Sequence, residues 1–417
     1  MEKSGKFRLT SLERNWILYD VGNSAFVLMV ATLIPIFFNA LAAAGGLSSV
    51  EYLAYWGYAS SAVTIITAVL SPILGTVADT KGFKKPIFIL CVFVGIVGCC
   101  AMGAASAWLP FLVIFVIAKV GFSGSLVFYD SMLSDVTTPE RMDEVSSRGY
   151  AWGYIGSCVP FVVCLGLVLG AGSIGISQMT ALNLALLLTA AWWLLTTLPL
   201  LKSYKQLYYV EVEKHAVRQS FVRIGHTLRH LPEDKQVFWF LLAFFCYIDG
   251  VYTIIDMATA YGTALGLDTT GLLLALLVTQ IVAFPSALVF GRLSNKYPSA
   301  KLIPVCIAAY AGIAVFAFFL TRQWQFWVLA VIVGMFQGGV QALSRSHFAK
   351  IIPPEKSGEY FGLFDICGKG ASFLGTMIVS VGSQLTGSAN VGVGSLILLF
   401  IVGFVLFRVS CRQGETA

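Results

Sequence analysis

Ionisable and amide side chains interrupt several long apolar stretches of this sequence. A charged group inside a lipid bilayer costs about 2.5–3.5 kcal/mol, so such a residue faces a water-filled pathway or pairs with a partner. A carboxylate at that depth can bind an ammonium group or carry a proton, and a lysine can bind a carboxylate. Amides can hydrogen-bond a ligand without a charge. The residues of this kind are Asp20 and Asn23; Lys119 and Asp130; Asp249, Tyr252 and Asp256; Gln337 and Gln341; and Asp365 and Lys369.

The sequence offers little for covalent or metal chemistry. It contains no P-loop, no dinucleotide-binding glycine pattern and no paired nucleophile and base. His226 and His230 have a spacing that could hold a metal, but no third ligand is evident. The nine cysteines form no CxxC or zinc spacing, and we interpret them as small buried hydrophobes. We therefore expect no enzymatic activity, no cofactor and no metal site.

The apolar stretches are long enough to cross a membrane. The 417 residues are 58% hydrophobic and 12% charged, against about 45–50% and about 25% in soluble domains. This composition excludes a soluble enzyme, a secreted disulfide scaffold and a nucleic-acid binder. Backbone amides in hydrocarbon must bond within their own segment, which favours helices of roughly 20 residues. We predict an all-α polytopic membrane protein with twelve helices, at 16–40, 54–78, 86–106, 109–133, 148–170, 180–201, 236–262, 270–292, 301–320, 326–349, 360–385 and 391–409.

The positions of Lys and Arg predict the orientation of these helices. Twenty-four of the 27 lie before the first helix, at the even-numbered connections or after the last helix, whereas Arg322 lies on the opposite side. Lys and Arg collect in cytoplasmic loops, so we expect both termini in the cytoplasm. The same bias explains the net charge of +6 without a nucleic-acid partner. A cleaved signal peptide at the first helix would reverse the bias, and Asp20 and Asn23 within that helix also argue against cleavage.

The chain divides into two halves. A hydrophilic linker at 202–235 separates a predicted bundle at 1–201 from a second at 236–417. The halves repeat, because Gly75–Lys85 follows the second helix and Gly291–Tyr297 follows the eighth helix in the matching place. Parallel six-helix repeats with a substrate site between them are typical of secondary transporters.

The linker contains apolar residues at helical spacing. They are Val217, Phe221, Ile224, Leu228 and Leu231, and arginines lie on the other faces. The pattern predicts a basic amphipathic helix that either lies on the inner leaflet or docks against the bundles.

Several segments resemble known transporters. Gly75-x-x-Ala78-Asp79-x-x-Gly82-x-Lys84-Lys85 resembles the signature between helices 2 and 3 of the major facilitator superfamily, and the second half has a degraded copy with Asn295 in place of the acid. Further segments resemble the "unknown major facilitator" family, which contains vacuolar amino-acid effluxers linked to autophagy. They are Trp16-x-x-Tyr19-Asp20-x-Gly22-Asn23-Ser24-Ala25-Phe26, Tyr247-x-Asp249-Gly250, Gln337-Gly338-Gly339-x-Gln341-Ala342-x-Ser344-Arg345, and Glu359-x-Phe361-Gly362-Leu363 running to Gly368-Lys369.

The resemblance implies two pseudo-symmetric six-helix bundles that rock about a central cavity. It also implies that Asp79, Lys84 and Lys85 belong to a cytoplasmic gate. We expect the Asp79 loop to contact the cytoplasmic ends of helices 4, 5 or 11, because a carboxylate bonds cations and helix N-terminal amides. Helices 3, 6, 9 and 12 carry essentially no charge in their cores, so we expect them outermost, with helices 1, 4, 7 and 10 around the cavity.

Asp20 and Asp130 lie near the predicted cytoplasmic ends of their helices. Arg14 or another cytoplasmic cation could reach Asp20, which leaves a packing or gating role and a binding role open. Arg148 or Arg141 could pair with Asp130, for which a structural role is favoured.

Asp249 lies about halfway along its helix, with no basic residue within a turn, so a role in substrate or proton coupling is favoured. Asp256 is two turns further on, on roughly the same face. Lys119 could hold a substrate carboxylate or neutralise an acid such as Asp249. Asp365 and Lys369, four residues apart, either pair with each other or take part in gating or binding.

Gln337 and Gln341 lie on one face of a helix, where lining a site is favoured over joining helices. Proton-driven exporters of the superfamily carry an arginine motif in helix 4, and the nearest residue here is Lys119, so proton coupling stays open.

Taken together, the sequence favours a transporter of a small polar or zwitterionic solute. The resemblance implies an amino acid or a related metabolite, with efflux favoured and a proton as a possible co-substrate. A lipid or lysolipid transporter and a non-transporting receptor or scaffold are the alternatives; the first needs a lateral opening and the second a sealed interior. We expect a monomer in the bilayer of the cell membrane.

Overall fold

The computed structural model describes residues 7–211, 222, 224–227 and 229–416. Within the helices, the side chains of 49, 50, 53, 259, 260, 264, 269, 270, 273, 369–373, 415 and 416 lie outside this description. The regular structure of the described part is helical, apart from one isolated parallel bridge between Thr80 and Val210.

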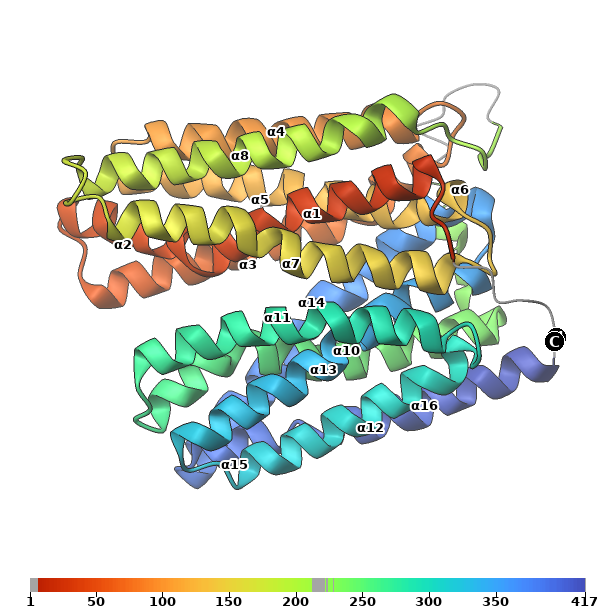
Figure 1. Cartoon of the computed structure of the whole chain (residues 1–417). Coiled ribbons are helices and arrows are strands. Elements are labelled where there is room, and N and C mark those ends of the chain that lie inside the picture. Colours follow the sequence, from red (N-terminus) through yellow and green to blue (C-terminus); the bar gives the residue numbers. More distant parts are fainter. Residues whose placement is uncertain (1–6, 212–221, 223, 228, 417) are drawn as a thin grey trace.

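The helices form two groups, one from each half of the chain (Figure 1). The first group contains α1 (Ser11–Ala31), α2 (Leu33–Ala44), α3 (Ser49–Ala78), α4 (Lys84–Ala104), α5 (Trp108–Ser131), α6 (Leu133–Val136), α7 (Met142–Leu169) and α8 (Gln178–Ser203). The second contains α10 (Lys235–Ala264), α11 (Thr269–Leu293), α12 (Ser299–Phe318), α13 (Gln323–Ile351), α14 (Ser357–Thr386), α15 (Ala389–Gly394) and α16 (Ile397–Thr416), with short 3-10 turns at Leu231–Glu233 and Pro354–Lys356.

The predicted twelve helices are present. Eleven spans in the described residues are long and apolar enough to cross a membrane, from 20 to 34 residues each. The remaining helix, α14, has 30 residues, which is also enough to span a bilayer. The all-α polytopic fold class is confirmed.

The first span differs in detail from the single helix expected at 16–40. It is broken at Thr32 into α1 and α2, which together run over 34 residues. Pro35, in the first turn of α2, has no N–H to bond a carbonyl one turn earlier, so the helix bends there. The Thr32 hydroxyl donates to the Leu28 carbonyl and occupies an acceptor at the break.

The helices that the sequence predicts to be outermost lie at the edges of the molecule. In Figure 1, α4 and α8 form one edge and α12 and α16 the other. Between the groups, α3 packs against α14 and α7 packs against α11. The polar residues lie on α1, α5, α10 and α13. The edge helices of each group cover the outer side of these four helices.

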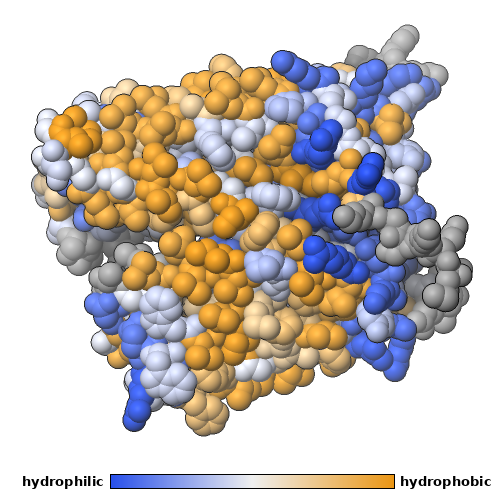
Figure 2. All heavy atoms as spheres, in the orientation of Figure 1, coloured by the Kyte–Doolittle hydropathy of each residue, from blue (hydrophilic) through white to orange (hydrophobic). Residues whose placement is uncertain are grey.

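Hydrophobic side chains cover the flank of the molecule, and hydrophilic ones lie at its two ends, in a large group at one end and a smaller group at the other (Figure 2). The large group lies at the end at which α1 begins and at which α8 and α16 end, and we call this end the terminal face. An apolar flank and a charged end match the surfaces of a helical protein that spans a bilayer.

Candidate functional site

A buried cluster of charges joins the two groups of helices. Arg345 of α13 is 2% exposed, and its Nη1 lies 2.9 Å from Asp130 Oδ1 of α5 and 3.8 Å from Asp20 Oδ2 of α1. Its Nε donates to the Ser146 hydroxyl at 2.9 Å, and its Nη2 donates to the Ser146 carbonyl at 3.0 Å. Arg345 comes from the second half of the chain and its partners from the first, so the cluster connects the halves through the protein interior.

Aromatic rings enclose the guanidinium of Arg345. Its central carbon lies 4.3 Å from the ring centre of Tyr150, 4.7 Å from that of Trp16 and 5.4 Å from that of Tyr129. A Cβ on Gly149 would stand 3.1 Å from both Arg345 and Asp20, so the close approach of α7 requires a small residue there. These rings keep water away from the guanidinium. A charge of the cluster that lost its partner would therefore be costly.

The expected partners of Asp130 were wrong, and the cation near Asp20 is Arg345 rather than Arg14. Arg141 pairs with Glu13 at 2.7 Å instead of with Asp130. Arg148 pairs with Glu144, four residues earlier in its own helix, and Arg345 takes both aspartates. Arg148 lies in α7 and bonds within its own helix, whereas the long side chain of Arg345 extends from α13 to the carboxylates of α1 and α5.

Asp249 of α10 is fully buried and contacts α14. Its Oδ1 accepts a hydrogen bond of 2.8 Å from the backbone N–H of Gly375 and one of 3.3 Å from the Thr253 hydroxyl. Its Oδ2 has no hydrogen-bond partner among the described residues. Asp249 therefore faces a neighbouring helix and retains one acceptor oxygen. Its role in binding or coupling stays a prediction.

Lys119 of α5 lies against aromatic rings of its own group. Its Nζ is 4.7 Å from the ring centre of Phe122 and 5.9 Å from that of Phe26. Asp256, two turns after Asp249 in α10, has an exposed side chain. A role of Lys119 toward a substrate carboxylate or toward an acid of α10 stays a prediction.

Asn23 of α1 and Tyr252 of α10 are the two remaining candidate site residues on these helices. Asn23 is buried and donates to the Tyr19 carbonyl one turn earlier at 3.1 Å. Tyr252 is half-buried, and a Cβ on Gly368 of α14 would lie 3.8 Å from its ring.

The two glutamines of α13 have different partners. Gln341 accepts a hydrogen bond of 3.1 Å from the Tyr154 hydroxyl of α7, so it links the two groups. Gln337 is buried and its amide lies 3.4 Å from the Gln280 oxygen of α11, within its own group. The amides therefore join helices, and the lining of a central cavity stays a prediction.

A tyrosine–serine pair repeats in the two halves. The Tyr19 hydroxyl of α1 donates to the Ser125 hydroxyl of α5 at 2.6 Å. Tyr247 of α10 and Ser344 of α13 hydrogen-bond at the same distance, 2.6 Å. Since α1 and α10 are the first helices of their halves, and α5 and α13 the fourth spans, the pairs occupy matching places. Asp20 and Arg345 each follow a member of these pairs directly.

The loop after α3 meets the start of α14 at the terminal face. The carboxylate of Asp79 accepts hydrogen bonds from the backbone N–H groups of Gly358 at 2.7 Å and Glu359 at 2.8 Å. Burial raises the pKa of Asp79 to about 7, against the opposing effects of the Lys84 ammonium and these two amides. The contact expected between the Asp79 loop and the eleventh helix is present. A gating role for it stays a prediction.

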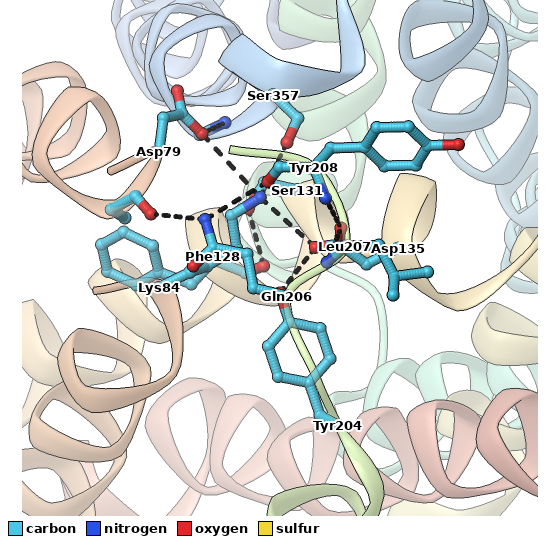
Figure 3. A network of polar contacts seen from close by, with 12 residues as sticks. Asp79, Lys84, Phe128, Ser131, Asp135, Tyr204, Gln206, Leu207, Tyr208 and Ser357 are labelled. Atoms are coloured by element: carbon cyan, nitrogen blue, oxygen red, sulfur yellow. Dashed lines mark hydrogen bonds and ion pairs between the residues drawn. The ribbon is translucent and has the colours of Figure 1, made fainter. Parts of the chain in front are cut away.

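Lys84 extends this contact to the linker (Figure 3). Its buried Nζ lies 2.9 Å from the Ser357 hydroxyl, 3.5 Å from Asp135 and 3.8 Å from Asp79. Asp135 also accepts hydrogen bonds from the Tyr204 hydroxyl at 2.6 Å and from the backbone of Leu207 and Tyr208 in the linker.

Lys85 does not join the carboxylates that Lys84 contacts. Its Nζ donates to the Tyr204 carbonyl at 3.4 Å, at the start of the linker. The two neighbouring lysines of the motif therefore make different contacts. Lys84 bridges the two groups of helices, and Lys85 contacts the linker.

The second half has a matching contact with altered chemistry. Asn295, after α11, donates its side-chain N–H to Glu144 of α7 at 2.6 Å. A Cβ on Gly291 would lie 2.9 Å from Ser147, so α11 and α7 approach as closely here as a glycine permits. Where Asp79 accepts from backbone amides, Asn295 donates to a carboxylate. The two contacts occupy matching positions in the two halves, but the side chain is a hydrogen-bond acceptor in the first half and a donor in the second.

Two expectations fall partly outside the described residues. The side chain of Lys369 is not described, and Asp365 accepts a hydrogen bond of 2.7 Å from Ser71 of α3. Val217, Phe221 and Leu228 of the predicted amphipathic helix also lie outside. Within the described residues, no group of three His, Cys, Asp or Glu could hold a metal.

Sequence reasoning missed Arg345 as a site residue. The charge count places it with the cytoplasmic basic residues near the end of the predicted helix at 326–349, and the structure buries it within α13 in the charge cluster. One signal could have found it: Arg345 is four residues after Gln341 and eight after Gln337, on the same helical face.

Comparisons with known proteins identify the family. The family model described as "Vacuole effluxer Atg22 like" matches residues 11–416. The "Uncharacterized MFS-type transporter YxiO" of Bacillus subtilis (strain 168) is 42% identical over 98% of this chain and 97% of its own length. "Autophagy-related protein 22" of Saccharomyces cerevisiae (strain ATCC 204508 / S288c) is 28% identical over 58% of this chain and 53% of its own length. The chain thus spans about half the length of this fungal relative.

Solved structures show the same fold at low sequence identity. The human organic anion transporter MFSD10 (TETRAN) matches with a TM-score of 0.71 and 15% identity, over 95% of this chain and 99% of that chain. FucP, a major facilitator superfamily transporter in the outward conformation, matches with a TM-score of 0.70 and 16% identity, over 96% and 97%. The fold, the repeated halves and the family match agree. The chain belongs to the Atg22-like vacuole effluxer family of major facilitator superfamily transporters.

Proposed function

We propose that this protein moves a small zwitterionic solute, an amino acid or a related metabolite, by alternating access, with export the favoured direction. The solute class rests on the family and on the charges between the two groups of helices. The resemblance to amino-acid effluxers is carried by the segments around Asp20, Asp249 and Arg345.

The observation that carries the proposal is the position of Arg345 between Asp20 and Asp130. When the groups separate at this level, a buried arginine and two carboxylates lose their partners, which is costly unless other charges replace them. The carboxylate of a zwitterion can bind the guanidinium, and its ammonium group can bind an aspartate. The solute would then pair the charges that the opening exposes.

The terminal face is proposed to be cytoplasmic and the membrane to be the cell membrane. The charge bias supports the first point and the bacterial relative the second. The contacts described here between the groups, from Asp79, Arg345, Gln341 and Asn295, connect the halves of the helices nearest this face. The described conformation is then the one that is closed toward the cytoplasm.

Asp249 is proposed to couple transport to a proton or a cation. It is buried at mid-helix, and one of its oxygens has no hydrogen-bond partner among the described residues. A carboxyl group in such a place can exchange a proton when the access to it changes sides.

Counterflow in proteoliposomes tests the function. Vesicles containing the purified protein and loaded with one unlabelled amino acid at a time are given a labelled one, with and without a pH gradient. We expect exchange with at least one amino acid, and a loss of exchange in Arg345→Lys, because lysine lacks the planar fork that reaches both aspartates and Ser146. Exchange of neutral sugars or lipids, with none of any amino acid, would contradict the proposed solute class.

A further inference from the structure

Ser146 of α7 contacts Arg345 with two oxygen atoms. The Nε of Arg345 donates to the Ser146 hydroxyl at 2.9 Å, and the Nη2 donates to the Ser146 carbonyl at 3.0 Å. Nε and Nη2 lie on one edge of the planar guanidinium, where two N–H groups point in the same direction. The two oxygens of a carboxylate bind an arginine in this bidentate pattern. Ser146 therefore fixes the plane of the guanidinium as well as its position.

The contacts with the aspartates do not by themselves define that plane. Asp130 meets Arg345 through one hydrogen bond of 2.9 Å, from Nη1 to Oδ1, and Asp20 Oδ2 lies 3.8 Å from the same nitrogen. Contacts at a single nitrogen leave the direction of the other N–H groups open. Because Nε and Nη2 are bound to Ser146, Nη1 is directed toward both carboxylates.

The Ser146 hydroxyl also bonds the backbone of α13. A guanidinium has N–H donors and no acceptor, so the hydroxyl oxygen accepts from Arg345 and its own hydrogen is left for another partner. The hydroxyl donates to the Ala342 carbonyl at 2.8 Å. Ser146 is fully buried, and these three hydrogen bonds all join α7 of the first group to α13 of the second. Separation of the groups at this level breaks them together.

We propose that Ser146 is the positioning residue of Arg345 in the transport cycle. It directs the guanidinium toward Asp130 and Asp20 while the groups are in contact, and it releases the guanidinium when they separate. The inference rests on the proposed alternating access, in which the released arginine then meets the solute. Because Ser146 bonds Arg345 only in the closed conformation, its hydroxyl stabilises that conformation over the open one.

Ser146→Ala removes the hydroxyl and leaves the carbonyl that bonds Nη2. The Nε–H of Arg345 then stays buried without its acceptor, and a hydrogen bond to a charged group is lost. We expect the ratio of closed to open protein to fall by about tenfold or more.

Ser147→Ala is the matched control. Ser147 is the next residue of the same helix and is fully buried, and its hydroxyl has no hydrogen-bond partner among the described residues. The control makes the same chemical change without removing a contact to Arg345.

Hydrogen exchange measured by mass spectrometry on the purified full-length protein, without solute, tests the proposal. The reporters are the amides of Gly358 and Glu359, which bond Asp79 at a different contact between the groups. They should exchange about tenfold faster or more in Ser146→Ala than in the parent, and at the parental rate in Ser147→Ala. Unfolding temperatures close to that of the parent show that the variants are folded.

A double-mutant cycle separates positioning from local packing. If the hydroxyl acts through Arg345, Ser146→Ala should accelerate exchange much less in the Arg345→Lys background than in the parent, because lysine has no Nε–H edge to orient. Equal acceleration in both backgrounds, parental exchange in Ser146→Ala, or the same acceleration in Ser147→Ala overturns the inference. No solute is used, so a parent that exchanges no amino acid contradicts the proposed function, while the role of Ser146 is still decided by the amide exchange.

Discussion

The contact between α3 and α14 gives the sharpest test of the conformation described. Gly75 lies directly against the backbone of α14: a Cβ built on it would stand 2.1 Å from the Gly358 carbonyl oxygen and 3.2 Å from the Glu359 nitrogen. These are backbone atoms at the start of a helix, and they cannot rotate away as a side chain could. We expect Gly75→Ala to force the two helices apart.

The size of the effect follows from these distances. An ordinary Cβ contact begins at 3.4 Å, about 1.3 Å longer than the 2.1 Å available here. A closely packed interior cannot accommodate that difference unless the helices move. The same shift would lengthen the hydrogen bonds from Gly358 and Glu359 to Asp79, now 2.7 and 2.8 Å, beyond hydrogen-bonding range. Overpacking of this kind costs about 1–3 kcal/mol, which lowers the ratio of closed to open protein by roughly 5- to 150-fold.

Hydrogen exchange measured by mass spectrometry reads this contact directly. In Gly75→Ala the amides of Gly358 and Glu359 should exchange faster than in the parent, and solute turnover should fall. Gly368→Ala is the matched control, since it makes the same change in an interior turn of α14 and its Cβ would lie 3.8 Å from Phe244 and Tyr252, an ordinary contact. Equal exchange and equal turnover in Gly75→Ala and the parent would refute the close approach of α3 to the start of α14.

Three further outcomes are expected. Arg345→Lys should lower turnover by at least about tenfold, and a variant that retains parental counterflow would remove Arg345 from the transport site. Asp249→Asn, which cannot ionise, should fold and exchange solute but lose accumulation driven by a gradient, as measured by uptake with and without a pH difference. Asp79 has a pKa of about 7 in the closed contact and should return toward its ordinary 3.8 when water reaches it, so the closed form binds the proton more tightly. That form should thus gain stability as the pH falls from about 7 toward 4 and lose it as the pH rises through 7. Amide exchange at the start of α14 across this pH range measures the effect, and Asp79→Asn, which cannot titrate, should remove the pH dependence.

The sequence alone determined the architecture. Crossing a bilayer imposes a local requirement on each segment, namely about 20 apolar residues with all backbone amides bonded internally, so the twelve helices can be found one at a time. The repeated motif after the second and eighth helices likewise located the Asp79 contact, because that motif is contiguous. The break at Thr32 was missed, since the apolar pattern continues through it and Pro35 alone changes the backbone.

The partners of the buried charges were decided only by the tertiary structure. Asp130 and Arg345 are 215 residues apart, and no local pattern states which helices of the two halves meet. The sequence left open which cytoplasmic cation pairs with Asp20, and the packing of α1, α5, α7 and α13 brings it to an arginine from the other half. The same reason separates Lys84 from Lys85: adjacent in sequence, they point in different directions from α4, one toward Asp135 and Ser357 and the other toward the linker. Membrane insertion acts on each segment, but an ion pair depends on which segments come together, and only the folded chain contains that information.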